Sequence, residues 1–340
     1  MKNTKLNTTF GLTSDLNTRL YRCIFFIKRA NEIKKTMSIV QVSHFSKYYG
    51  NLKAVDDLSF EIEEREIFGM LGPNGAGKTT TVETLEGLRK PDAGEIFIDG
   101  HSVLTNPDAI KPIIGVQLQA NAFYPKMKVE EAINLFRRYY PKSLPAEQIL
   151  ELVSLIEKRR AQVEDLSGGQ QQRLAFGLAL VNDPKILFLD EPTTGLDPQA
   201  RRKTWELIQK FRETGKTILL TTHYMEEAQQ LCDRVLIIDH GKKLALDSPQ
   251  SLITKEAGDR HIEFTLTEQV PQEKFRTLPY ISKMWRNGNR FIFQTDVPDK
   301  LVVALIRYAD EQNIEIRDLH IQRPTLEDVF ISYTGRTLRE

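Results

Sequence analysis

The sequence has 340 residues, of which 40% are hydrophobic and 27% are charged; this is close to an average soluble composition and allows two globular domains. No apolar run approaches the roughly 18 to 20 residues that a membrane helix needs, so we expect no membrane span. Two cysteines without a Cys/His cluster argue against a disulfide framework or a zinc site and favour a reducing, cytoplasmic compartment.

Residues 1–36 form a strongly basic segment. They hold eight Lys/Arg and two acidic residues, whereas the rest of the chain is slightly acidic. An acidic body argues against nucleic acid as a partner. The basic segment could lie on anionic lipid, or it could be an extension outside the fold. An alternating strand pattern starts directly after Met37 and favours a disordered extension.

A glycine-rich segment lies between a predicted strand, 66–72, and a predicted helix that begins at Lys78 and places Val82, Leu85 and Leu88 on one face. Backbone N–H groups and a helix N-terminus in this arrangement bind phosphate, while the lysine reaches the β and γ phosphates and the next hydroxyl binds Mg²⁺. The alternative is a glycine-rich turn that happens to contain Lys and Thr. The predicted strand before it and the predicted helix after it argue against this alternative. The predicted nucleotide site comprises Gly72, Pro73, Asn74, Gly75, Ala76, Gly77, Lys78, Thr79 and Thr80.

Residues 128–160 read as helical. The segment KVEEAINLFRRYY places Val129, Ile133 and Phe136 on one face, and AEQILELVSLIEKRR repeats the spacing. We therefore expect a helical insert here.

The segment 165–184, DLSGGQQQRLAFGLALVNDP, places Ser167, Gly168 and Gly169 directly before a long predicted helix. A serine and two glycines at a helix start predict a second phosphate-binding loop. About 90 residues separate it from the first loop. The two loops must either meet within one chain or each complete a site on a second copy.

The segment 184–198, PKILFLDEPTTGLDP, predicts a buried parallel strand that ends in two carboxylates. Open α/β sheets bind ligands at this carboxyl edge. Asp190 would hold Mg²⁺, and Glu191 would orient or deprotonate the attacking water. Alternatively, the two acidic residues at the end of the strand could simply cap the next turn. The phosphate-binding loop upstream favours a role of these carboxylates in phosphoryl transfer.

The motif LSGGQ between this loop and this strand resembles the nucleotide-binding domain of ATP-binding cassette (ABC) proteins over roughly residues 38–250. The resemblance implies an α/β, P-loop NTPase fold whose core carries antiparallel β and helical subdomains. It implies two copies that sandwich two ATP molecules. By this resemblance, Tyr49 would stack on adenine, Gln119 would contact Mg²⁺ and the attacking water, and His223 would contact the γ-phosphate. Gln170 would belong to the LSGGQ loop, and Asp197 to the loop that crosses the dimer. The other histidines, including His240, are predicted to be surface or packing residues.

In this family, the helical insert and the loop ANAFYPKMK grip a membrane subunit. Phe123 and Tyr124 could make that contact or pack under their own loop.

Strands and helices after residue 255 follow the order βαββαβ, which predicts a small α+β ferredoxin-like domain. Its ending, RPTLEDVFISYTG, resembles the C-terminal domain of drug and daunorubicin-resistance exporter ATPases of the ABC-2 type. We predict an extension at 1–36, a nucleotide-binding domain at 37–254 and an accessory domain at 255–340.

These features predict the ATP-hydrolysing subunit of an exporter, with ATP and Mg²⁺ as cofactors. Its partners would be a separately encoded transmembrane permease and a second ATPase subunit, as a homodimer, which would place it in the cytoplasm at the inner face of the membrane. An importer ATPase and a soluble ABC ATPase are the alternatives. A soluble ABC protein that acts on ribosomes would normally carry two cassettes, but a second GxxxxGKT and a second LSGGQ are absent. A chromosome or repair ATPase would have long heptad repeats, and only modest helical inserts occur here.

Overall fold

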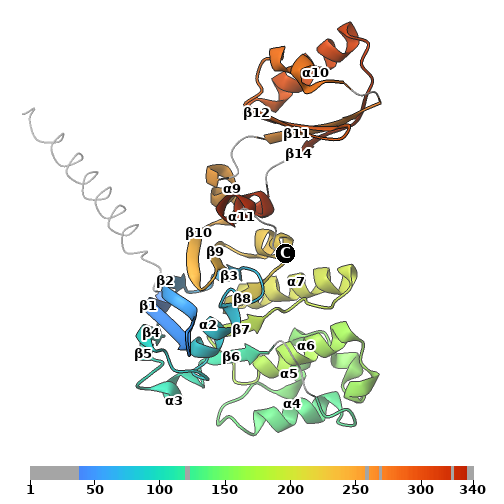
Figure 1. Cartoon of the computed structure of the whole chain (residues 1–340). Coiled ribbons are helices and arrows are strands. Elements are labelled where there is room, and N and C mark those ends of the chain that lie inside the picture. Colours follow the sequence, from blue (N-terminus) through green and yellow to red (C-terminus); the bar gives the residue numbers. More distant parts are fainter. Residues whose placement is uncertain (1–37, 119–122, 257–259, 268–269, 323–324, 335–340) are drawn as a thin grey trace, which may run out of the picture. The chain divides into compact units, whose positions relative to one another are not determined.

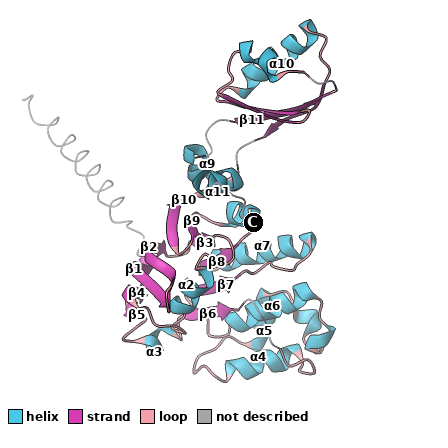
Figure 2. Cartoon of the chain, in the orientation of Figure 1, coloured by secondary structure: helices cyan, strands magenta, loops and turns pink. Residues whose placement is uncertain are grey.

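The structure is a computed structural model that describes residues 38–118, 123–256, 260–267, 270–322 and 325–334. Its central sheet has six strands in the order β10-β9-β3-β8-β7-β6 (Figures 1 and 2). The five strands from β9 to β6 are parallel, and β10 is an antiparallel edge. The strands are β3 (Ile67–Leu71), β6 (Ile114–Gln117), β7 (Ile186–Asp190), β8 (Thr217–Thr222), β9 (Arg234–Asp239) and β10 (Lys242–Asp247).

Every residue of β3 and β7 is buried, as their continuous apolar runs predict for a sheet covered on both faces. Successive side chains of β3 alternate between two cores. Phe68 and Met70 pack with a four-stranded sheet and helix α2 (Lys78–Leu85), whereas Ile67 and Leu71 belong to the core that includes the helical insert. The predicted central strands and the α/β fold are therefore confirmed.

The second sheet has the order β2-β1-β4-β5, with the β1–β4 and β4–β5 pairs antiparallel. Its strands are β1 (Ser38–Tyr49), β2 (Leu52–Glu63), β4 (Ala93–Ile98) and β5 (His101–Ser102). Helix α2 (Lys78–Leu85) contributes Val82 and Leu85 to the same core, as expected. Leu88 was predicted on that face, and this was wrong: the helix ends at Leu85, Gly87 has a φ of +76°, and Leu88 is 67% exposed.

The helical insert is confirmed: α4, α5 and α6 contact one another (Figure 1). Val129 and Ile133 of α4 are fully buried, but Phe136, expected on the same face, is 41% exposed. The short helices are α3 (Pro107–Ile110), η1 (Ile156–Lys158) and η2 (Val163–Asp165), and the longer ones are α4 (Val129–Arg137), α5 (Ala146–Leu152), α6 (Gly168–Ala179), α7 (Pro198–Glu213) and α8 (Met225–Leu231). No helix in the described ranges is both long and apolar enough to span a bilayer.

The third sheet has the order β12-β13-β11-β14 and is antiparallel throughout. The predicted βαββαβ order is confirmed, with a 3₁₀ helix, η3, in place of the first helix. Four phenylalanines form the centre of its own core: Phe264, Phe275, Phe291 and Phe293. The elements are β11 (Arg260–Leu266), η3 (Gln272–Thr277), β12 (Lys283–Asn287), β13 (Arg290–Thr295), α10 (Pro298–Glu311) and β14 (Ile316–Gln322).

Helices α9 (Pro249–Glu256) and α11 (Leu326–Thr334) lie side by side (Figure 1). Leu326, Val329 and Phe330 of α11 are fully buried in the same core as Ala228 and Leu231 of α8. The sequence placed α11 in the accessory domain, but its buried side chains belong to the core of the cassette. The boundary between residues 254 and 255 otherwise stays a prediction.

Candidate active site

The phosphate-binding loop connects the end of β3 to the start of α2. Gly75 and Gly77 have φ angles of +80° and +103°, which L side chains rarely adopt. A Cβ on Gly77 would also lie 2.5 Å from the carbonyl oxygen of Ala54. The ammonium of Lys78 donates to the carbonyl oxygens of Gly72 (2.7 Å) and Pro73 (3.1 Å). The loop therefore curls around its own lysine.

A cavity of about 340 Å³ opens beside this loop. It brings the aromatic side chain of Tyr49, the loop and the carboxylate of Glu191 together, as the sequence predicts. Lys47 and Arg89 approach the Tyr49 ring at 5.7 and 5.5 Å from its centroid. Gly72 and Ala76 of this loop are buried and do not line the cavity. The residues that line the cavity are Tyr49, Leu52, Lys53, Ala54, Pro73, Asn74, Gly75, Gly77, Lys78, Thr79, Thr80, Glu191 and His240.

Asp190 is the last residue of β7 and is 6% exposed. Its carboxylate accepts a hydrogen bond from the Thr221 hydroxyl on the neighbouring strand β8. Burial raises the pKa of Asp190, and the hydrogen bond from Thr221 opposes the rise. Burial lowers the pKa of Lys78, while the charges of Glu191 and Asp190 oppose that change. The site therefore holds a partly desolvated cation among carboxylates.

Glu191 follows with a φ of +48°, an uncommon backbone state for a residue with a side chain. Its Oε2 accepts from the Thr194 hydroxyl (3.1 Å), and its Oε1 lies 3.2 Å from His223 Nδ1 and 3.7 Å from Lys78 Nζ. Burial would raise the pKa of Glu191, but the hydrogen bond and charge of His223, with the charge of Lys78, outweigh it and lower the pKa. The carboxylate is therefore ionised near neutral pH.

Oxygen ligands suit Mg²⁺, which usually binds through one or two protein groups plus phosphates. The Thr79 hydroxyl side chain lines the cavity, and the Asp190 carboxylate ends the strand beside it. These two residues fit the predicted metal site. Gln119, the third predicted ligand, lies outside the described residues.

The LSGGQ loop forms the start of α6. Ser167 and Gln170 make a reciprocal cap: the Ser167 N–H donates to Gln170 Oε1 (2.9 Å), and the Gln170 N–H donates to Ser167 Oγ (3.4 Å). Asp197 caps α7 through the N–H groups of Gln199 and Ala200. An added Cβ on Gly168 would meet no atom within 4 Å.

Ser167, Gly169 and Asp197 line a second cavity of about 180 Å³, together with Arg173 and Lys203. No described residue lines both this cavity and the one beside the phosphate-binding loop. The structure therefore does not bring the two predicted phosphate-binding loops into one cavity within this chain.

The sequence missed the place of His240 in the site. This exposed residue was expected at the surface, yet it lines the nucleotide cavity from the turn between β9 and β10. The N–H of Gly241 donates to the carbonyl of Ala76 (3.0 Å), which fixes this turn against the phosphate-binding loop. The pairing of β9 with β3, which has no local sequence signal, brings this turn next to the loop.

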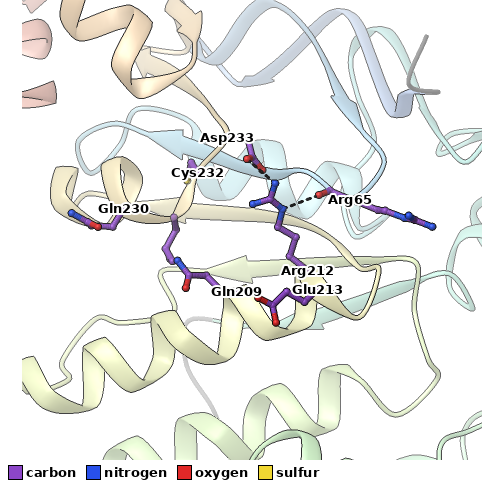
Figure 3. Close-up of a pocket in the computed structure, with 8 residues that line it drawn as sticks. Arg65, Gln209, Arg212, Glu213, Gln230, Cys232 and Asp233 are labelled. Carbon is purple, nitrogen blue, oxygen red and sulfur yellow. Dashed lines mark hydrogen bonds and ion pairs between the residues drawn. The ribbon is translucent and has the colours of Figure 1, made fainter. Parts of the chain in front are cut away.

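A larger pocket of about 480 Å³ lies elsewhere (Figure 3). Arg212 in this pocket donates to the carbonyl of Arg65 and pairs with Asp233 at 3.0 Å. Arg65 and Asp233 precede β3 and β9, so the pocket lies at the amino ends of the parallel strands. Open sheets bind ligands at the opposite edge, so size does not identify the active site here.

A mainly apolar groove of about 270 Å³ lies between the end of β6 and the helical insert. Phe123 packs against the core, as one of the two predicted alternatives has it, whereas Tyr124 is 71% exposed; a contact of either residue with a membrane subunit stays a prediction. The groove is lined by Val116, Gln117, Leu118, Phe123, Tyr124, Met127, Ala132, Leu135, Phe136, Val163, Ala175 and Leu178.

Comparison with known proteins matches two family models: "ABC transporter" at residues 55–194 and "ATP-binding protein DrrA1-3-like, C-terminal domain" at residues 251–334. The chain is 40% identical to "Nod factor export ATP-binding protein I" of Ralstonia nicotianae, over 89% of this chain and 95% of that protein. It is 34% identical to "Linearmycin resistance ATP-binding protein" of Bacillus subtilis, over 89% and 100% of the two chains.

Solved structures agree with this result. A protein from Clostridium perfringens described as part of an ABC transporter complex superposes with a TM-score of 0.59 at 26% identity, over 64% of this chain and 91% of that one. An ATP-binding cassette solved as a dimer bound to ADP and Pi gives 0.55 at 27%, over 62% and 98%. This chain belongs to the ATP-binding subunits of the ABC transporter family and is an ATPase.

Proposed function

We propose that this chain powers export through a separate membrane permease, and that it hydrolyses ATP as a dimer of two copies. Two similar relatives are named for Nod factor export and for linearmycin resistance, and the C-terminal family model points to the same exporter branch. These likenesses favour export over import and over a soluble role.

The observation that carries the proposal is the separation of the two cavities. One holds the phosphate-binding loop and Glu191, and the other holds Ser167 and Gly169 at the start of α6. A helix start favours an anion, and the anionic ligand of this family member is ATP. In a two-fold dimer one surface can serve both sites, so each ATP would bind to Glu191 and the loop of one copy and to Ser167 of the other.

The chain's own groups suit hydrolysis in such a site. Lys78, held by loop carbonyls and near Glu191, can transfer its hydrogen bonds to the β and γ phosphates of ATP. The ionised Glu191 can accept a proton from the attacking water, and His223 holds its Oε1. Mg²⁺, held by Thr79 and Asp190, with Gln119 as a further predicted ligand, would neutralise charge on the phosphates. We further propose that Tyr49 stacks on the adenine.

The apolar groove is the proposed contact with the permease. It is framed by the exposed Tyr124 and the half-exposed Phe136, and aromatic side chains are enriched in protein interfaces. Docking there would place this chain in the cytoplasm at the inner face of the membrane.

Size-exclusion chromatography with MgATP tests the dimer. Glu191→Gln removes the base, so bound ATP should persist and the variant should elute as a dimer. Adding Ser167→Arg places a bulky cation at the start of α6 and should return the protein to a monomer that still binds ATP. Adding Ser282→Arg instead, at an exposed serine of the third sheet's domain, is the matched control and should stay dimeric. A monomeric Glu191→Gln at saturating ATP would contradict the proposal.

A further inference from the structure

Glu227 is a fully buried carboxylate on α8. Its Oε1 accepts two hydrogen bonds, from the Thr193 hydroxyl (2.8 Å) and from the Trp205 indole N–H (3.0 Å). Thr193 lies in the turn that follows Glu191, and Trp205 lies on α7. One buried oxygen thus joins three segments of the chain.

These segments include two groups that contact the Glu191 carboxylate, one at each oxygen. Thr194, next to Thr193, donates to Glu191 Oε2, and His223, just before α8, contacts Glu191 Oε1. Glu227 therefore connects the turn whose Thr194 donates to one oxygen of Glu191 with the segment whose His223 lies near the other. It does not line the nucleotide cavity, so it acts at a distance from the ATP.

A buried carboxylate is costly unless hydrogen bonds compensate for its lost hydration, and well-packed apolar residues often replace such groups without loss of stability. Burial raises the pKa of Glu227, and the hydrogen bonds from Thr193 and Trp205 and the charge of Arg201 oppose the rise. Among the described residues its Oε2 has no hydrogen-bond partner. A buried carboxylate therefore stabilises this part of the fold less than an apolar side chain of similar size could. What the carboxylate adds is a set of directed hydrogen bonds to Thr193 and Trp205.

We propose that Glu227 is a positioning residue for ATP hydrolysis: it holds the turn after Glu191 and the segment after His223 in the arrangement in which both contact Glu191. The inference rests on the proposed role of Glu191. An apolar residue at position 227 would fill the space but leave these two segments free to shift apart.

Steady-state ATPase kinetics of the full chain test the proposal. Thr193→Val and Trp205→Phe each remove one donor with little change of shape, and each should lower kcat about tenfold while KM for ATP stays within about twofold. Glu227→Leu should lower kcat further, whereas Glu227→Gln keeps a carbonyl oxygen for both donors and should restore most of the rate. Thr217→Val is the matched control, because its buried hydroxyl accepts a hydrogen bond from the N–H of Arg65 at the opposite edge of the sheet.

Fluorescence adds a readout of the contact itself. The chain has two tryptophans, so Trp285→Phe leaves Trp205 as the sole reporter. In that background Glu227→Leu should shift the Trp205 emission, and Glu227→Gln should leave it near the starting value. If Glu227→Leu does not fold, the Thr193 and Trp205 variants still decide the question.

The proposal is overturned if Thr193→Val and Trp205→Phe match Thr217→Val in kcat, or if they raise KM and leave kcat unchanged. Glu191→Gln distinguishes a failure of the proposed role of Glu191 from a failure of the positioning role of Glu227. Turnover in Glu191→Gln would refute the role of Glu191 and the positioning role with it. Loss of turnover there, with full activity in Thr193→Val, would refute the positioning role alone.

Discussion

Glu86→Gln should change how the stability of the protein depends on pH. Glu86 follows the last residue of α2 and is 8% exposed. Among the described residues its Oε2 has no hydrogen-bond partner. Burial, and then the negative charges of Asp190 and Glu83, raise its pKa to about 8 from the ordinary 4.5. The folded protein therefore holds a proton on Glu86 at neutral pH.

The sign and size of the effect follow from this shift. Because the folded pKa lies above the unfolded one, the unfolded state releases the proton first, and the folded state loses stability as the pH rises from about 4.5 towards 8. Each pH unit in this window costs about 1.4 kcal/mol, so wild-type protein should lose about 2 to 3 kcal/mol between pH 5.5 and 7.5 through this group. Glutamine cannot ionise and avoids that loss.

The assay is denaturant unfolding of both proteins at the two pH values, in EDTA and without nucleotide. The difference in unfolding free energy between the two proteins is compared at the two pH values. The contributions of the other titrating groups are common to both proteins and cancel in this difference. Glu64→Gln, at an exposed carboxylate after β2, serves as the control and should follow the wild type. Equal pH dependence of wild type and Glu86→Gln would show that Glu86 is ionised in the fold, and would refute the reasoning.

Three further predictions concern single side chains. Lys78→Ala should abolish phosphate release and most ATP affinity, since it removes the cation that the loop holds for the phosphates; undiminished turnover would refute the site. Tyr49→Ala should raise KM for ATP about tenfold, as expected for lost base stacking, while tripolyphosphate inhibition stays unchanged; weaker tripolyphosphate inhibition would contradict a base contact. Phe330→Ala should cost about 3 to 5 kcal/mol of unfolding free energy measured in denaturant, and a loss below about 1 kcal/mol would contradict its place in the cassette core.

Motifs that depend on local sequence could be predicted. The phosphate-binding loop needs only a strand, a few glycines and a helix in succession, and the structure has all three around Lys78. The carboxylates of Asp190 and Glu191 follow directly from the end of a buried strand. The βαββαβ order of the third sheet's domain was also readable, because short apolar and aromatic segments such as RFIFQTD and the turn residues Asn287, Gly288 and Asn289 are local signals.

Features that depend on distant partners could not be predicted. Glu227 lies 34 residues from Thr193 and 22 from Trp205, and an EEAQQ segment alone gives no sign that one of its glutamates is buried. His240 reaches the cavity because β9 pairs with β3 and Gly241 bonds to Ala76, two contacts between distant segments. No helix was predicted from the sequence at α11, and the apolar residues of this segment do not say which core receives Phe330.

The most direct test of the account is a cross-link between two copies. In a Glu191→Gln chain with both native cysteines replaced, Asn74→Cys is introduced into one preparation and Ser167→Cys into another, and the two are mixed with a short bifunctional maleimide. The composite site predicts a cross-linked species of two chains that forms with MgATP and is lost without nucleotide. The contradicting result is a mixture that stays single-chain at saturating MgATP, together with an internal cross-link when both cysteines are placed in one chain.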